Sequence, residues 1–174
     1  MLNILAISGS LRAASSNSQL LKAAERLAPP SMRIEHYEGV GLLPHFSPDL
    51  TAQLPEAVAE LNARVTKADG LLISCPEYAR GIPGSFKNAL DWLVGTESFP
   101  GKPVALFNAS ARASAAQAAL RLVLETMSAR LVDEASITVE LLSRKLDAQG
   151  IAADAEIEAA IRRALHAFAV AIAT

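Results

Sequence analysis

Residues 71–92 read LLISCPEYARGIPGSFKNALDW. The first five residues are mostly apolar and are typical of a buried strand. Pro76 ends the hydrogen-bond ladder of that strand because proline lacks an N–H, and Pro83 is well placed to begin a helix. A strand that leads through a glycine- and proline-rich loop into a helix places the loop at the carboxyl edge of a sheet, where α/β proteins bind ligands. The stretch therefore predicts both a class of fold and the position of a site.

Similar apolar runs recur along the chain, and stretches with helical spacing of apolar residues lie between them. Strict alternation of strands and helices, with almost wholly apolar strands, favours a parallel sheet covered on both faces. We predict strands at residues 2–8, 32–37, 70–75, 103–108 and 131–139, and helices around Leu20–Leu27, Val58–Val65, Phe86–Leu93, Ala116–Met127 and Ile157–Ile172.

A chain of 174 residues with 51% hydrophobic residues can bury a substantial core as one domain, residues 1–174. The fold predicted is α/β, a flavodoxin-like three-layer sandwich in which helices flank a five-stranded parallel sheet of order 2-1-3-4-5. A dinucleotide-binding Rossmann domain is the nearest alternative. The sequence contains neither its G-x-G-x-x-G pattern nor a P-loop.

Charge and cysteine content narrow the classes of partner. A formal net charge of −2 gives no basic field, so we expect no binding to nucleic acid or to an anionic membrane. The single cysteine, Cys75, excludes an internal disulfide framework, and the three histidines show no metal-ligand spacing with it. The first residues do not resemble a secretory signal, and no charge-free apolar run reaches ~18 residues. We therefore expect a cytoplasmic protein without a metal.

A second polar segment follows the first predicted strand. Residues 8–17 read SGSLRAASSN and lead into the first predicted helix. Hydroxyl groups beside the free N–H groups of a helix start suit a phosphate, and Arg12 adds a full positive charge. Ser15, Ser16 or Asn17 would serve equally well as an ordinary helix cap. Both interpretations remain open.

The loop after residue 75 can offer main-chain N–H and C=O groups to a flat heterocycle. Tyr78 would either stack against such a ring or pack as an ordinary amphipathic side chain. Glu77 would either act as an acid or base or be solvated in the loop. Gly81 and Gly84 allow backbone conformations that other residues avoid. Cys75 lies at the end of an apolar strand, and we expect it to be a buried side chain that packs in the core and is not a reactive thiol.

Ser-Gly-Ser-Leu-Arg-x-x-Ser-x-Asn at 8–17 and Pro-Glu-Tyr-x-x-x-Ile-Pro-Gly-x-x-Lys-Asn-Ala-Leu-Asp-Trp at 76–92 resemble the NADPH-dependent FMN reductase family, whose members include flavin, quinone, chromate and azo-dye reductases. Residues 43–46 and 49–50 also resemble the family's loop after its second strand. The resemblance implies a flavodoxin-like fold, FMN as cofactor and NADPH or NADH as electron donor. It also implies a homodimer or homotetramer.

Carried over by position, the resemblance assigns residues to three parts of an FMN site. The phosphate would be held by Ser10, Arg12, Ser15, Ser16 and Asn17. The isoalloxazine ring would be lined, largely by main-chain atoms, by Pro76, Glu77, Tyr78, Ala79, Arg80 and Gly81. The loop after the fourth strand, residues 108–112, would close the other edge of the ring through Ser110 and Arg112. No catalytic side chain and no metal ligand is assigned.

The chain departs from the family where many members read Pro-Glu-Tyr-Asn-x-Ser, because it carries Ala79 and Gly81 there. The missing amide and hydroxyl predict a weaker affinity for flavin. Arg80 and Arg112 would attract the phosphate of NADPH or remain solvated.

The resulting hypothesis is an FMN-dependent NAD(P)H oxidoreductase that reduces FMN, a quinone or a similar small molecule in a ping-pong cycle. The alternatives are a flavodoxin-like electron carrier and a divergent homologue without flavin.

Overall fold

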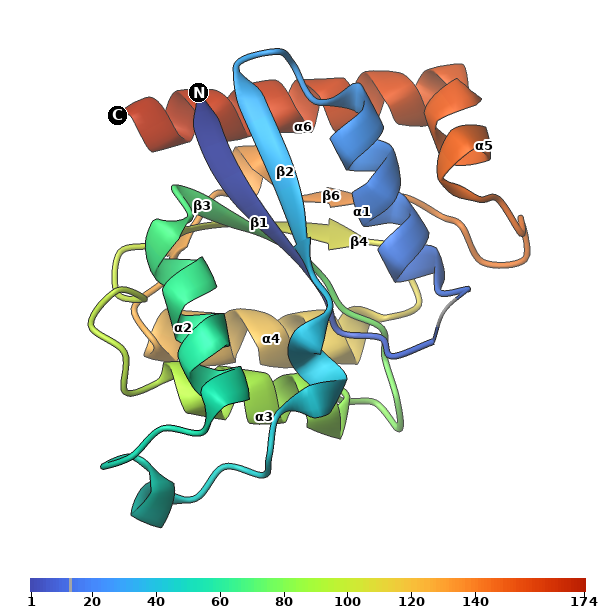
Figure 1. Ribbon diagram of the computed structural model, residues 1–174. Coiled ribbons are helices and arrows are strands. Elements are labelled where there is room, and N and C mark those ends of the chain that lie inside the picture. Colours follow the sequence, from blue (N-terminus) through green and yellow to red (C-terminus); the bar gives the residue numbers. More distant parts are fainter. Residues whose placement is uncertain (13) are drawn as a thin grey trace.

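A parallel β-sheet forms the centre of the structure (Figure 1). The computed structural model describes residues 1–12 and 14–174. The strands run in the order β2-β1-β3-β4-β5, and β6 also pairs with β4. This order confirms the predicted flavodoxin-like arrangement. The strands are β1 (Leu2–Ser8), β2 (Met32–Tyr37), β3 (Gly70–Ser74), β4 (Pro103–Asn108), β5 (Arg130–Leu131) and β6 (Ile137–Thr138).

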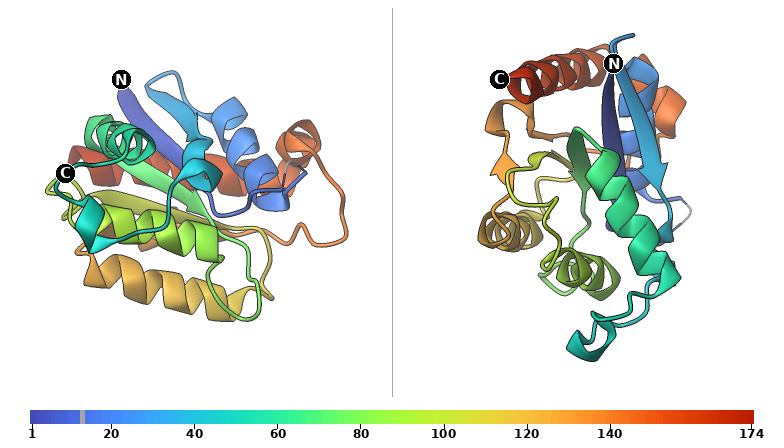
Figure 2. Two further views of the ribbon diagram at one scale, coloured as in Figure 1. Left: turned by 60° about the horizontal axis from the view of Figure 1, so that its bottom comes forward. Right: turned by 60° about the vertical axis from the view of Figure 1, so that its left-hand side comes forward.

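Helices cover both faces of the sheet (Figure 2). Neighbouring residues of a strand point to opposite faces, so Ile4 and Ala6 of β1 belong to one buried cluster and Leu5 and Ile7 to the other. The first cluster is closed by α1 (Ser16–Leu27), α5 (Ala148–Ala153) and α6 (Ala155–Ala173). The second is closed by α2 (Glu56–Lys67), α3 (Gly84–Leu93) and α4 (Ser114–Thr126).

The fifth strand differs from the single strand predicted over residues 131–139. Two short strands, β5 and β6, both pair with β4, and a 3-10 turn (Asp133–Ala135) separates them. Ser136 accounts for the break. Its hydroxyl accepts a hydrogen bond from Leu106 N at 3.1 Å and donates one to Val132 O at 2.9 Å, so a side chain replaces part of the backbone ladder.

The short helix α5 has no counterpart in the prediction, because six residues are too few to show helical periodicity. Two aspartates begin the consecutive helices α5 and α6. Asp147 accepts a hydrogen bond from Gly150 N at 2.8 Å, and Asp154 accepts one from Ile157 N at 3.1 Å. None of the helices in the described ranges has the length and apolar character needed to cross a bilayer.

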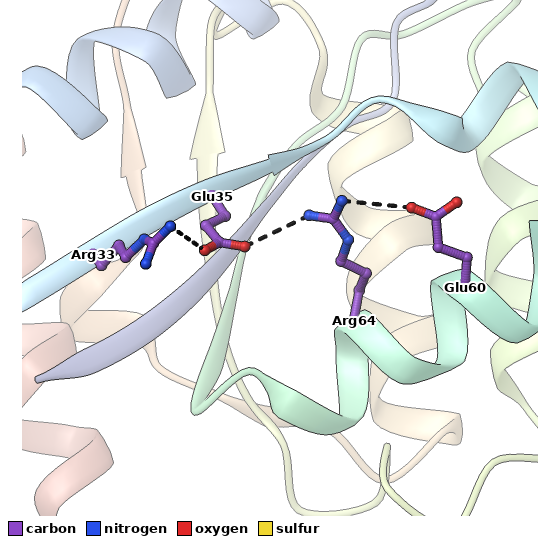
Figure 3. A network of polar contacts seen from close by, with 4 residues as sticks. All are labelled: Arg33, Glu35, Glu60 and Arg64. Atoms are coloured by element: carbon purple, nitrogen blue, oxygen red, sulfur yellow. Dashed lines mark hydrogen bonds and ion pairs between the residues drawn. The ribbon is translucent and has the colours of Figure 1, made fainter.

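Strand β2 forms one edge of the sheet and carries a network of charged side chains (Figure 3). Arg33 pairs with Glu35 at 2.9 Å, Glu35 with Arg64 of α2 at 3.5 Å, and Arg64 with Glu60 at 3.5 Å. Exposed pairs of this kind contribute about 0–1 kcal/mol each to stability. Their clearer effect is to keep the edge strand from pairing with another chain.

Candidate functional site

A cavity of about 640 Å³ lies at the carboxyl edge of the sheet. Its walls come from the loops after β1, β3 and β4 and from the segment that follows β6. Such a volume falls within the range of about 300–1,000 Å³ that is usual for small-molecule sites. The cavity brings together most of the residues predicted from the sequence: Ser10, Arg12, Ser15, Ser16, Asn17, Pro76, Glu77, Tyr78, Ser110 and Arg112.

The start of α1 forms one end of the cavity. Ser15 occupies the position before the helix with an extended backbone, and its side chain makes no capping hydrogen bond with any described residue. The sequence left phosphate binding and helix capping open for this segment. The structure shows no capping by the Ser15 side chain. An uncapped helix start presents N–H groups and the positive end of the helix dipole, an arrangement suited to an anion.

Hydroxyl groups hold the loop after β1 in place. The Ser10 hydroxyl accepts a hydrogen bond from Arg12 N at 3.3 Å and lies 3.4 Å from the hydroxyl of Tyr78. Deeper in the fold, Ser74 at the end of β3 donates to the side-chain oxygen of Asn17 at 2.9 Å. Asn17 thus anchors α1 to the sheet through its oxygen, and its NH2 group is the part that can donate to a ligand.

The loop after β3 folds back on itself as a tight hairpin. Tyr78 and Gly81 exchange two backbone hydrogen bonds of 3.1 and 3.0 Å. Ala79 and Arg80 form the turn between them, with φ angles of 49° and 60°. Two left-handed residues in succession define a type I′ turn, which asparagine and glycine normally favour. Ala79, Arg80 and Gly81 do not border the cavity.

The two nearby glycines do not supply the left-handed residues of this turn. Gly81 and Gly84 do not have positive φ angles, so the unusual conformations fall on Ala79 and Arg80 instead. A Cβ atom added at Gly81 would meet only Tyr78 O, at 3.9 Å, which is an ordinary contact.

Glu77 fixes the same loop to a neighbouring helix. Its carboxylate accepts a hydrogen bond from Ala116 N, in the first turn of α4, at 3.0 Å. The residue before α4 is Ala113, which has no side chain able to cap it. Glu77 therefore caps α4 from a distance of 39 residues in the sequence. The structure gives it a positioning role, which the sequence pattern did not reveal.

Cys75 is buried beside this loop and lines the cavity floor. Burial raises the pKa of its thiol to about 12. A thiol with that pKa stays protonated near neutral pH and is a poor nucleophile. The expectation of a packing role is therefore confirmed.

Glu140 organises the loop after β4, a role that no pattern in the sequence predicted. Its carboxylate accepts hydrogen bonds from Leu142 N at 3.0 Å, Ala111 N at 3.1 Å and the Ser110 hydroxyl at 3.3 Å. The Leu142 and Ala111 N–H groups, more than the Ser110 hydroxyl and the charge of Arg112, lower the pKa of Glu140. The ionised carboxylate thus holds Ser110 at the cavity wall.

The charged side chains on the cavity wall are mostly basic. Arg12, Arg112 and Lys145 are its cations, and Glu77 and Asp147 are its acids. Both carboxylates are engaged by the backbone of helices, Glu77 at α4 and Asp147 at α5. The excess of positive charge and the open helix start together fit a ligand that carries a phosphate.

Comparison with known proteins bears on the identity of this ligand. The family described as NADPH-dependent FMN reductase matches residues 2–141. The chain is 36% identical over 155 residues to a 2-hydroxy-1,4-benzoquinone reductase from Burkholderia sp., covering 86% of this chain and 84% of that protein. It is 34% identical over 172 residues to an NAD(P)H-dependent FMN reductase from Pseudomonas aeruginosa, covering 95% and 92%.

A solved structure is similar over almost the whole fold. It is FerB, a flavoenzyme NAD(P)H:(acceptor) oxidoreductase from Paracoccus denitrificans. The TM-score is 0.88 at 30% sequence identity, and the match covers 99% of this chain and 98% of that one.

Proposed function

The chain belongs to the NADPH-dependent FMN reductase family, and we propose that the cavity at the carboxyl edge of its sheet is the FMN site. Members of this family are oxidoreductases that use FMN and NAD(P)H, which makes the chain an NAD(P)H-dependent FMN or quinone reductase by family. The observation that carries the proposal is that residues 10, 12 and 14–17 line the same cavity as residues 76–78, although the two segments lie far apart in the sequence.

The phosphate end of the site lies at the start of α1. A phosphate monoester carries about −1.5 to −2 charges at neutral pH. Arg12 offers one positive charge, and the uncapped helix start adds roughly half a charge. The hydroxyls of Ser10, Ser15 and Ser16 and the amide of Asn17 complete a set of donors that fits this group.

The ring end lies between the loops after β3 and β4. Pro76, Glu77 and Tyr78 offer main-chain groups on one side, and Ser110 and Arg112 lie on the other. Glu77 holds the first loop against α4, and Glu140 holds the second. Because both loops are anchored by hydrogen bonds, little ordering is needed when the ring binds.

FMN held by these residues would supply the redox chemistry, as acceptor of a hydride from NAD(P)H and donor of electrons to a second substrate. The chain contributes binding, orientation and exclusion of water, and we assign no side chain as nucleophile or proton carrier. We propose that NAD(P)H and the acceptor enter the cavity in turn, which would make the cycle ping-pong. The acceptor is FMN, a quinone or a similar flat molecule.

Exposed apolar side chains at the rim support a homodimer or homotetramer. Leu11 is 60% exposed, Tyr78 48% and Leu142 49%, although each lies on or beside the cavity wall. Apolar groups at the mouth of a site are typical of an interface, so a second subunit would cover them. We place the protein in the cytoplasm, where its single free thiol, Cys75, stays reduced.

Initial-rate kinetics test this function. NADPH oxidation is measured with benzoquinone as acceptor, at several fixed concentrations of each substrate, with the protein saturated with FMN. Parallel lines in the double-reciprocal plot, and loss of the rate when FMN is removed, are the expected results. Converging lines would contradict the ping-pong cycle, and a rate independent of FMN would contradict the cofactor assignment.

A further inference from the structure

The segment between β6 and α5 forms a wall of the cavity to which no motif assigned a function. In Figure 1 it is the orange loop that extends beside the blue helix α1. Its residues that border the cavity are Leu141, Leu142, Ser143, Lys145, Leu146 and Asp147.

This segment is attached to the phosphate end of the cavity. Ala148 N, at the start of α5, donates a hydrogen bond to the side-chain oxygen of Gln19 at 2.9 Å. Gln19 lies one helical turn after Ser15 on α1, and its own backbone N–H bonds to Ser15 O. Lys145 precedes Ala148 by three residues, so their Cα atoms lie within about 11 Å of each other. Lys145 thus lies three residues from a direct contact with α1, and it borders the same cavity as the start of that helix.

The other charged groups of the segment already have partners. Arg144 donates to Asp154 at 2.7 Å, and Asp147 accepts from Gly150 N at 2.8 Å. For Lys145, residues 1–12 and 14–174 provide no hydrogen bond or ion pair. Among the charged groups of this segment, the Lys145 ammonium group is therefore the cation that can bind a ligand.

The backbone conformation of Lys145 is one that does not favour lysine at this position. Its φ angle is 49°, a left-handed conformation that is unfavourable for an ordinary L-residue. Glycine or asparagine would suit that conformation better than lysine. A lysine is therefore not explained by the turn it occupies.

We propose that Lys145 binds the phosphate of FMN as a second cation in addition to Arg12. This inference rests on the proposed FMN site. Arg12 and the helix start together supply roughly 1.5 positive charges, which is less than the charge of a phosphate dianion, and Lys145 supplies a further positive charge. The phosphate of NADPH has the same chemistry, but the attachment of the segment to α1 favours that of FMN.

Flavin binding to the full chain tests the proposal. The dissociation constants of FMN and of riboflavin, which lacks the phosphate, are measured by quenching of flavin fluorescence. Lys145→Asn removes the charge and suits the left-handed backbone, and Lys145→Arg keeps the charge. Lys22→Ala is a matched control, because Lys22 is exposed on α1 and does not border the cavity.

Lys145→Asn should raise the Kd for FMN about tenfold, the low end of the range for a hydrogen bond to a charged group, because Lys145 is exposed. The Kd of this variant for riboflavin should stay within about twofold of the wild-type value. In Lys145→Arg and Lys22→Ala, the Kd for FMN and the Kd for riboflavin should both stay within about twofold of the wild-type values. An unchanged Kd for FMN, or equal weakening of both flavins, would overturn the proposal. So would a KM that rises for NADPH but not for NADH while FMN binding is unaffected.

Arg12→Ala separates failure of this inference from failure of the function. If Arg12→Ala weakens FMN selectively and Lys145→Asn does not, the role of Lys145 is wrong and the FMN site stands. If the wild-type protein binds neither flavin, the proposed function itself is wrong.

Discussion

Replacing Arg80 with glycine should stabilise the folded protein, because Arg80 has a φ angle of 60° in the turn between Tyr78 and Gly81. A left-handed conformation costs an L-residue about 1–2 kcal/mol. Glycine avoids that cost but loses about 0.5–1 kcal/mol through its greater freedom in the unfolded chain. The net gain is about 0.5–1 kcal/mol, which corresponds to a rise in Tm of roughly 1–4 °C for a chain of this length. Ala79→Asn, at φ 49°, should give a smaller gain.

Thermal unfolding followed by circular dichroism measures this change. Arg163→Gly serves as the control, because Arg163 is exposed within α6, where glycine costs about 1 kcal/mol. Arg80→Gly should raise Tm and Arg163→Gly should lower it. The Kd for FMN should stay within about twofold in the turn variants, since Ala79 and Arg80 do not border the cavity. A fall in Tm similar to that of Arg163→Gly would show that the left-handed conformation of Arg80 does not destabilise the fold.

Three further predictions concern Glu77, Glu140 and Cys75. Glu77→Ala removes the cap of α4 and should lower the free energy of unfolding by about 1 kcal/mol, measured by urea denaturation, whereas an unchanged midpoint would argue against capping. The lowered pKa of Glu140 means that its contribution to stability is fully present above its ordinary pKa of 4.5 and is lost as the pH falls through the folded value. Glu140→Gln should remove this part of the acid dependence, and identical acid unfolding curves would exclude it. The thiol of Cys75, with a pKa of about 12, should react with an aromatic disulfide reagent only after unfolding; rapid labelling of the native protein would show that it is accessible and ionised.

The sequence predicts the first four strands because each is a short buried run bounded by polar or turn residues. Three of them, β1, β2 and β4, have the predicted bounds, and β3 ends one residue earlier. The fifth strand was predicted as continuous, and the structure divides it. Its interruption depends on the contact of Ser136 with Leu106, which a local pattern cannot show.

The backbone of the hairpin could not be predicted from the sequence, for a local reason. Glycine is the usual signal for a positive φ angle, and the nearby glycines are Gly81 and Gly84. The hairpin register instead places Gly81 opposite Tyr78 and leaves the turn to Ala79 and Arg80. Without asparagine or glycine at those two positions, the type I′ turn has no sequence signal.

Most of the predicted site residues line one cavity, because the ends of parallel strands meet at one edge of the sheet. The residues that support them were not predicted. Glu77 caps a helix 39 residues away, and Glu140 holds a loop about 30 residues away. Contacts of this kind depend on the tertiary fold and leave no periodicity in the sequence.

Anaerobic titration with NADPH shows whether the cavity binds FMN and lets NADPH reduce it. The purified protein is loaded with FMN, separated from free flavin and titrated while the visible absorbance of oxidised flavin is recorded. Binding and reduction at the cavity predict that the yellow colour stays with the protein and bleaches on addition of NADPH, and that one addition of benzoquinone restores it. A preparation that retains no FMN, or retained FMN that NADPH does not bleach, would contradict the account.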